Sequence, residues 1–343
     1  GLQPAPLSNP RAMAGPNAAN GRLTVNTSQI AQNTLGLEIA LPSGQTLGDG
    51  QQHIFTLLYD IAPDAIGSRI NFEFIDSPVP RAIYDVNGNV LPVEFITPPT
   101  VLAQAATSVS AASYRGERIA PEEIVAVFGV GLATATQIAN TLPLPTTLAG
   151  TTIKVRDSAN VERHAPLFFV APTQINYLIP TGTAAGAATV LITSGDGTVS
   201  GSVVEVANVA PGIFTADASG RGLPAASALI FKADGAQSSQ PVARFDTTAS
   251  RFVAVPIDVG AAGDRVFLSL FGTGIRQRSL LENVRAIIGG VEAPVLYAGE
   301  QGGFAGLDQI NLEIPRSLSG SGVVDVVLIV DGAIANVVQI SIL

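Results

Sequence analysis

The sequence lacks cysteine and tryptophan, and only two of its 18 basic residues are lysines, Lys154 and Lys232. Without cysteine, neither disulfide bonds nor thiolate metal sites can hold the fold together. Charged residues make up only 13% of the 343 residues, which is less than the surface of a soluble monomer usually carries. We therefore expect part of the surface to be covered, for example by other copies of the chain.

Positive charge and long apolar runs are also scarce. The net charge is −9, and no stripe of Lys or Arg offsets it, which argues against nucleic acid as a partner. No stretch approaches about 18 uninterrupted apolar residues, so the sequence predicts no membrane span. The chain begins with Gly1 and its single methionine is Met13. A removed signal peptide would explain this, as would a trimmed boundary, and we expect a secreted or cell-surface protein.

Short apolar runs rich in Val, Ile, Thr and Phe recur along the chain, as in DRVFLSLFG (264–272) and VVDVVLIVDG (323–332). They alternate or run fully apolar over four to eight positions, which is typical of strands in a β-sandwich. Residue pairs suited to tight turns separate them: Asn87-Gly88, Asp196-Gly197, Gly289-Gly290 and Asp331-Gly332. Helical periodicity is nearly absent, apart from one turn near 279–283. The sequence predicts an all-β fold.

Residues 1–20 are rich in Pro, Ala and Asn and have no periodicity. They are typical of a flexible tail. We treat them as an N-terminal arm, which if ordered must lie against its own domain or against a neighbouring subunit.

One phrase occurs twice: APTQINYLIP (171–180) and GLDQINLEIP (306–315). Each copy follows an apolar strand that ends in Phe-Gly-x-Gly, and each leads into a final hairpin. The residues that the copies share are Phe128, Gly129, Gly131, Gln174, Asn176 and Pro180 in the first, and Phe271, Gly272, Gly274, Gln309, Asn311 and Pro315 in the second. The repeat predicts two sandwiches, over residues 106–210 and 211–343. The second carries an inserted lead-in (220–245) with strand-like segments.

The repeated polar residues have a structural interpretation. Alternation places the isoleucine of Gln-Ile-Asn on one face and its two amides on the other, and the proline ends strand pairing. We expect the amides to hydrogen-bond backbone groups of the preceding loop. A ligand site is conceivable, but two copies at equivalent positions favour a structural role. The Phe-Gly-x-Gly glycines are interpreted as bulges or corners rather than phosphate loops, because no βαβ unit surrounds them.

These motifs, in this order, resemble the immunoglobulin-like IPT/TIG family. The region from SAASYRGERIAPEEIVAVFGVGLA (110–133) to the last strand resembles the C-terminal module of exported acidobacterial (Solibacter-type) proteins. That resemblance covers about two thirds of the chain and implies export and an Ig-like fold; it implies no catalytic residues. Residues 21–105 are similar in strand order to a cohesin-like sandwich, which need not imply dockerin binding.

The candidate sites for chemistry are weak. Asp85, Asn87 and Asn89 alternate around Gly88 like part of a calcium loop, but an ordinary hairpin turn explains them better. The histidines, His53 and His164, lie in different predicted domains and lack partners for a zinc site.

No Gly-x-Ser-x-Gly elbow is present, and the acidic residues, such as Glu122, Glu123 and Asp258, are scattered without an identifiable glycosidase pair. The basic stretch 276–278 is interpreted as solvated or interface-forming. We expect no cofactor and no catalysis.

Function is therefore expected to lie in surfaces. The leading hypothesis is an exported structural protein whose sandwiches assemble with other copies into a filament or surface layer, with strand addition from the arm or from GRLTVNTSQI (21–30). The alternative is a monomeric adhesin or carbohydrate-binding module that recognises surface glycans. It predicts clustered exposed aromatics, and the sequence has five Tyr and no Trp. An enzyme with a carboxylate cleft is the third possibility.

Overall fold

The computed structural model describes residues 7–32, 34–48, 50, 52, 54–61, 69–70, 73–95 and 101–343. The chain divides into two compact units, residues 1–104 and residues 105–343. The described residues form strands and short 3-10 turns and contain no α-helix, so the all-β prediction is confirmed. The candidate His53 lies outside the described residues.

The first unit contains short paired strands. β1 (Leu7–Ala14) pairs antiparallel with β4 (Phe55–Ile61), β2 (Arg22–Asn26) with β3 (Gly36–Ala40), and β5 (Arg69–Ile70) with β6 (Val101–Ala105). The 3-10 turns Pro16–Ala18 and Ile30–Gln32 flank β2. The cohesin-like sandwich of residues 21–105 stays a prediction.

The described part of the N-terminal segment is ordered and pairs within its own unit. Residues 7–14 form β1, and the register of β1 on β4 shifts between Ser8 and Arg11. Pro10 lies in that shift, where its missing N–H costs no ladder hydrogen bond. Residues 22–26, which were a candidate for strand addition, are paired with β3. Residues 7–14 and 22–26 are therefore paired within their own unit, which is one of the two placements expected for an ordered arm.

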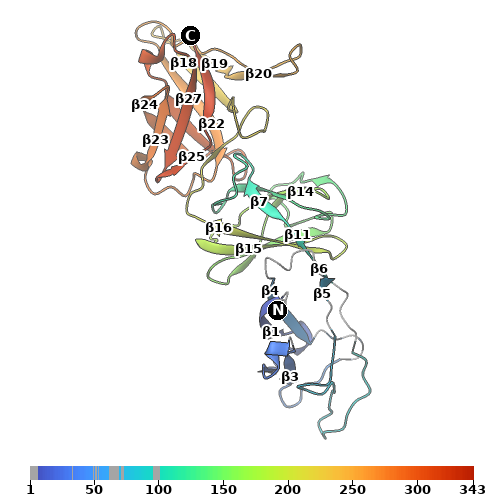
Figure 1. Cartoon of the computed structure of the whole chain (residues 1–343). Coiled ribbons are helices and arrows are strands. Elements are labelled where there is room, and N and C mark those ends of the chain that lie inside the picture. The colour runs from blue at the N-terminus through green and yellow to red at the C-terminus, as the bar shows by residue number, and fades with distance from the viewer. Residues whose placement is uncertain are drawn as a thin grey trace. The chain divides into compact units, whose positions relative to one another are not determined.

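The second unit holds two sandwiches, here called Ig1 (residues 106–210) and Ig2 (residues 211–343) (Figure 1). In Ig1 one sheet has the order β7 (Thr107–Ser110), β8 (Ile124–Phe128), β14 (Gln174–Leu178), β13 (Leu167–Val170), β9 (Gln137–Ile138). The facing sheet contains, in order, β10 (Thr147–Leu148), β11 (Thr151–Arg156), β15 (Gly186–Thr193) and β16 (Val199–Val206), with β12 (Glu162–His164) also on β11.

Ig2 repeats this plan. One sheet has the order β19 (Gln237–Pro241), β18 (Ala226–Phe231), β22 (Arg265–Thr273), β26 (Asp308–Glu313), β25 (Val295–Glu300), with β17 (Gly212–Ile213) on β22. The other contains β24 (Val291–Ala293), β23 (Val284–Ile288) and β27 (Gly322–Val330), with β28 (Ala333–Ile334) and β29 (Val338–Ile342) on β27. The 3-10 turns are Leu281–Asn283, inside the expected helical turn, and Arg316–Leu318.

The two ladders have the same register. Gln174 pairs with Phe128 in Ig1, and Gln309 pairs with Phe271 in Ig2. One sheet of each domain has the order of strands A, B, E and D of the immunoglobulin fold, and the other contains C, F and G. A register shift lies at the same place in both D strands, within 167–169 and within 295–297. The repeat in the sequence is thus a repeat of the fold, and the Ig-like prediction is confirmed.

In each domain the segment after the first strand crosses to the other sheet. Ile119 forms a parallel bridge to Val206 of β16, and Ile257 forms one to Ile342 of β29. Both isoleucines are fully buried. The crossing segment therefore pairs with one end of the last strand in each domain.

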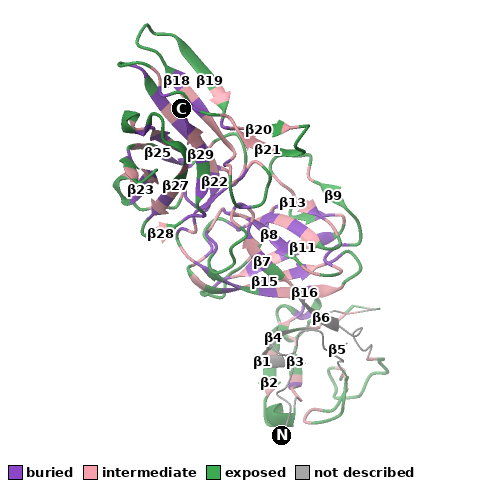
Figure 2. Cartoon of the chain, turned by 45° about the horizontal axis from the view of Figure 1, so that its top comes forward, coloured by how far each residue is buried: buried purple, intermediate pink, exposed green. Residues whose placement is uncertain are grey.

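Alternating side chains fill each sandwich. The strand β11 reads buried, intermediate, buried along TTIKVR, and β26 does so along DQINLE. Figure 2 shows the buried residues in purple along the strands of both domains. Each domain has its own core, one from Ile119 to Val206 and one from Val209 to Ile342. The lead-in of Ig2 forms β18, β19 and a separate ribbon of β20 (Ala243–Asp246) and β21 (Arg251–Ala254).

Candidate functional site: the junction of the two Ig-like domains

The repeated amides bond to one another. Gln174 Nε2 donates to Asn176 Oδ1 (2.8 Å) in Ig1, and Gln309 Nε2 donates to Asn311 Oδ1 (2.8 Å) in Ig2. The expectation that they bond the preceding loop is therefore wrong. The residues i and i+2 of a strand project from the same face, so the two amides reach each other directly. The prolines Pro180 and Pro315 lie just beyond the strands that carry these amides.

The Phe-Gly-x-Gly corners behave as the sequence predicts. Gly131 and Gly274 have φ of 66° and 74°, which disfavours any side chain. A Cβ on Gly272 or Gly274 would meet the backbone carbonyl oxygens of Gly212 and Ala210. Phe128 keeps 37% of its surface exposed, and its ring stacks on Tyr114 at 6.4 Å.

The second of these corners docks on Ig1. The hydroxyl of Thr273 accepts a hydrogen bond from Ile124 N of Ig1 (2.9 Å) and donates to Gly306 O of Ig2 (2.8 Å). Thr273 is fully buried, whereas Val130, at the same position of the first corner, is 72% exposed. Gly306 lies so close to Ig1 that a Cβ there would be 2.6 Å from Ile124 Cγ1 and closer still to Leu178.

A buried ion pair stands behind this corner. Asp308 is fully buried and accepts hydrogen bonds from Ile275 N (2.8 Å) and from Arg276 Nε (2.8 Å). The Arg276 side chain, 10% exposed, also donates to Leu307 O (2.9 Å). Burial raises the pKa of Asp308, while the Ile275 N–H and the Arg276 guanidinium act to lower it. A buried pair of this kind costs desolvation energy but is strongly destabilising to break.

The pair extends toward Ig1 through Glu122. Gln277 Nε2 donates to Glu122 Oε2 (2.7 Å), and Arg276 Nη1 lies 4.0 Å from Glu122 Oε1. The stretch 276–278 is therefore part of an interface, as one alternative predicted, and Arg276 is not solvated. Arg278 donates to Ala298 O (2.5 Å) on the edge of β25.

Glu123 is the second buried carboxyl at the junction. It is fully buried, and its Oε2 accepts a hydrogen bond from Ala120 N (2.6 Å). Burial raises the pKa of Glu123 to about 8, Ser110 and Ala120 act to lower it, and the charge of Asp308 raises it further. The carboxyl is therefore protonated at neutral pH, which spares the junction an unpaired buried charge.

The other predicted candidates lie apart from the junction. Asp85 Oδ1 accepts from the backbone N–H groups of Asn87 and Asn89 (2.8 Å each), and its Oδ2 accepts from the Asn89 amide (2.9 Å). These donors occupy the carboxylate as a turn cap, which supports the hairpin interpretation over calcium. His164 is an exposed residue of β12 opposite Lys154. Asp258 caps a turn at Gly260 N (2.7 Å).

Within the residues described here, no group of three or more His, Cys, Asp or Glu side chains is arranged to hold a metal ion. No helix among them is long and apolar enough to cross a membrane.

Neither a protein family nor a curated protein matches the chain. Among solved structures, bovine butyrophilin aligns with 69% of this chain and 99% of its own, at 10% identity and a TM-score of 0.21. A tetra-tandem repeat from the extending region of a large adhesion protein aligns with 69% of this chain and 73% of its own, at 12% identity and a TM-score of 0.19. The Ig-like assignment rests on the strand order and register above.

Sequence reasoning missed Thr273, Asp308 and Glu123 as a group. The signal was present where the two copies differ. Phe-Gly-Val-Gly of the first copy is Phe-Gly-Thr-Gly in the second, and Pro-Thr-Gln-Ile-Asn is Leu-Asp-Gln-Ile-Asn. Thr273 and Asp308 differ from the residues at the same positions of the first copy, and both make contacts that the first copy lacks.

Proposed function

We propose that the chain is a non-catalytic structural subunit that assembles with other copies of itself into an extracellular filament or surface layer. The observation that carries the proposal is the placement of three buried ionisable groups. Asp308, Arg276 and Glu123 lie at the joint between Ig1 and Ig2, where each hydrogen-bonds to groups of the chain itself. Chemistry of this kind supports a stiff joint, which a load-bearing subunit needs.

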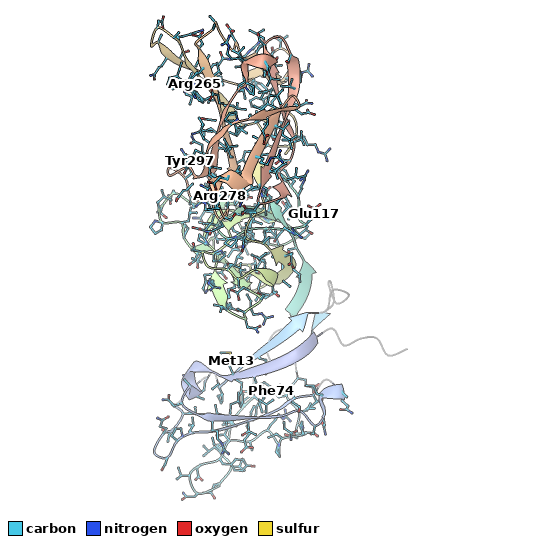
Figure 3. The ribbon with its side chains drawn as sticks, turned by 90° about the vertical axis from the view of Figure 1, so that its left-hand side faces the viewer. Met13, Phe74, Glu117, Arg265, Arg278 and Tyr297 are labelled. Atoms are coloured by element: carbon cyan, nitrogen blue, oxygen red, sulfur yellow. The ribbon has the colours of Figure 1, made fainter. Side chains whose placement is uncertain are left out.

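Most of the long sheet edges in this unit are protected. The crossing segments at Ile119 and Ile257 pair with one end of β16 and one end of β29, and Phe169 and Val170 of β13 pair with β9. The edge of β25 is blocked differently: Arg278 donates to Ala298 O, and the hydroxyl of Tyr297 donates to Glu300 O (2.5 Å). Arg278 and Tyr297 both lie on this part of Ig2 (Figure 3). Protection of this kind prevents uncontrolled strand pairing.

β19 has no such protection. Its sequence, QSSQP, is uncharged, and four of its five residues are exposed. Its neighbours Ala236 and Val242 hydrogen-bond to the β18 side (Lys232 N to Ala236 O, 2.8 Å; Val242 N to Ala226 O, 3.2 Å). Because backbone groups alternate in direction along an antiparallel strand, the N–H and C=O groups of Gln237 and Ser239 point outward. No side chain in the described part of the chain hydrogen-bonds to them.

These outward groups fit a second copy of the same edge. If two β19 strands meet antiparallel about Ser238, Gln237 of each faces Ser239 of the other, and both residues offer an N–H and a C=O. The contact is self-complementary, as a twofold interface requires. It brings together no charged side chain of β19, which matters for copies that each carry −9. Strand addition by the N-terminal segment would require β1 to leave β4 of its own chain and pair with β4 of another copy.

The test is negative-stain electron microscopy of the purified chain, with light scattering across protein concentration. We expect regular assemblies from the wild type. Ser239→Lys places a charge on the proposed contact and should shift assembly to higher concentration. Thr248→Lys makes the same change in charge at an exposed turn of the β20–β21 ribbon and should assemble normally. A wild-type chain that stays monomeric at all concentrations would overturn self-assembly. Equal assembly of both variants would overturn only the role of β19.

A further inference from the structure

A surface groove of about 560 Å³ lies where Ig1 and Ig2 meet. Three segments line it: residues 113–115 of Ig1, residues 219–221 of Ig2, and residues 336–337 beside the last strand. The groove therefore exists only when the two domains are joined. Its volume lies in the range of small-molecule sites, about 300–1,000 Å³.

The floor of the groove is rigid. Asn336 is buried, accepts a hydrogen bond from Ile213 N (2.7 Å), and donates to Ile213 O (2.8 Å) and Gly220 O (3.0 Å). Gly220 is buried with φ of 73°, and a Cβ there would lie 2.9 Å from Ser113 O of Ig1. With its amide used in full, Asn336 fixes the shape of the groove and leaves recognition to the rim.

The rim is positively charged. Arg115 and Arg221 line the groove, and no acidic residue does. Arg115 reaches across the junction to donate from Nη1 to Ile334 O (3.1 Å), which holds its guanidinium in place. Arg221 has no side-chain hydrogen bond or ion pair among the described residues. Asp217, two residues before Ser219, accepts from the Ser219 hydroxyl (2.7 Å).

Tyr114 adds a flat apolar surface beside the arginines. It is 41% exposed, and its ring is backed by Phe128 in a stacked arrangement. Its φ of 57° is uncommon for a residue other than glycine. Tyr114 closes a turn in which its N–H donates to Ser110 O and Ser110 N donates to Arg115 O (2.9 Å each), which holds the ring beside the groove.

We infer that this groove binds a carboxylate-bearing sugar, a uronic acid residue of an acidic glycan. The guanidinium groups of Arg115 and Arg221 match a carboxylate in charge and in planar geometry. The Tyr114 ring offers an apolar face to the C–H groups of the sugar ring, and Ser113 adds a hydroxyl at the rim. The inference does not depend on self-assembly.

The test is isothermal titration calorimetry of the full chain with trigalacturonate. The fully methyl-esterified trisaccharide is the uncharged control, and inorganic phosphate is the anion control. We expect saturable binding of trigalacturonate, with the ester and phosphate each at least about tenfold weaker. No binding at millimolar probe would overturn the inference. So would an ester of equal affinity, and phosphate of equal affinity would overturn the sugar part of it.

Substitutions locate the site. Arg221→Gln removes a charge that has no partner in the described chain, so we expect it to weaken binding at least about tenfold without loss of folding. Arg251→Gln, on β21, makes the same change elsewhere and should have no effect. Tyr114→Ala should weaken binding several-fold, whereas Tyr114→Phe, which keeps the ring, should not. Unchanged binding by Arg221→Gln in a folded chain would place the ligand elsewhere and overturn the assignment.

Discussion

Ig1 and Ig2 share the pairing of their central strands but differ at the Phe-Gly-x-Gly corner where those strands end. In both domains the phenylalanine of Phe-Gly-x-Gly pairs with the glutamine of Gln-Ile-Asn, in the same register. At the corner beside it, Val130 of Ig1 is exposed and Thr273 of Ig2 is buried against Ig1. The shared residues therefore define the sandwich, and the residues that differ define what each copy contacts.

The edges of the two D strands differ in the same way. In Ig1 the segment 129–150 between the second and third strands is long enough to form β9, which covers β13. In Ig2 the corresponding segment, 274–283, is shorter and forms no such strand. Arg278 within it donates to the β25 edge instead. The D-strand edge is therefore paired with a short strand in Ig1 and hydrogen-bonded by an arginine side chain in Ig2.

The largest expected effect comes from breaking the buried pair of Ig2. Asp308→Asn leaves the buried Arg276 without its closest partner, and we expect a loss of about 3–5 kcal/mol in the free energy of unfolding. Glu313→Gln breaks the more exposed Arg265–Glu313 pair (2.7 Å) and should cost about 1 kcal/mol or less. Urea unfolding followed by circular dichroism compares the two. Equal losses would mean that the Asp308 pair does not hold the junction.

A smaller loss is expected from added bulk at the junction. Gly306→Ala meets the left-handed backbone cost and a clash with Ile124 and Leu178 of Ig1, together about 3 kcal/mol. Gly302→Ala also has a positive φ, 85°, but nothing within 4 Å, so it should lose only about 1–2 kcal/mol. The same unfolding measurement applies. A Gly306 variant no less stable than the Gly302 variant would contradict the close approach of the two domains.

Stability should also depend on pH through Glu123. Its pKa is about 8 in the folded chain and ordinary when unfolded, so the folded state keeps a proton that the unfolded state releases. Stability is therefore lost as pH rises, by on the order of 2 kcal/mol between pH 6 and 8. Asp157 and Asp264, with pKa values lowered to about 2, are ionised throughout that window and do not contribute. Glu123→Gln should flatten the dependence measured by thermal melts. An equally steep profile would assign it to another group.

The smallest effect tests the corner itself. Thr273→Val leaves the buried Ile124 N–H and Gly306 O without their partner, at a cost of about 1–2 kcal/mol. Val130→Thr makes the reverse change at the exposed corner of Ig1 and should change stability by less than about 0.5 kcal/mol. Melting temperatures of the two variants compare the corners directly. Equal shifts in melting temperature would contradict the difference between the buried corner of Ig2 and the exposed corner of Ig1.

The sequence predicted those features that depend on neighbouring residues, such as the turns. Turn residues such as Gly289-Gly290 (φ 55° and 81°) and Asp331-Gly332 (47° and 82°) lie at hairpins as expected, because only small or turn-forming residues tolerate these angles. The repeat predicted two domains of one plan, whereas the pairing of Gln174 with Phe128 and of Gln309 with Phe271 came from the structure. Contacts between distant positions did not follow, since no local pattern shows that Asp308 meets Arg276 or that Ile124 meets Thr273. Composition left two placements open for an ordered N-terminal segment, and residues 7–14 take the one within their own unit, as strand β1.

The most direct measurement is differential scanning calorimetry of the full chain with one core variant in each domain. Val190→Ala in Ig1 and Leu328→Ala in Ig2 each truncate a fully buried side chain. If the junction joins the domains into one cooperative unit, Ig1 and Ig2 melt together and both variants lower the same transition. Two separate transitions, each lowered by only one variant, would contradict a junction that holds the two Ig-like domains as a single structural unit.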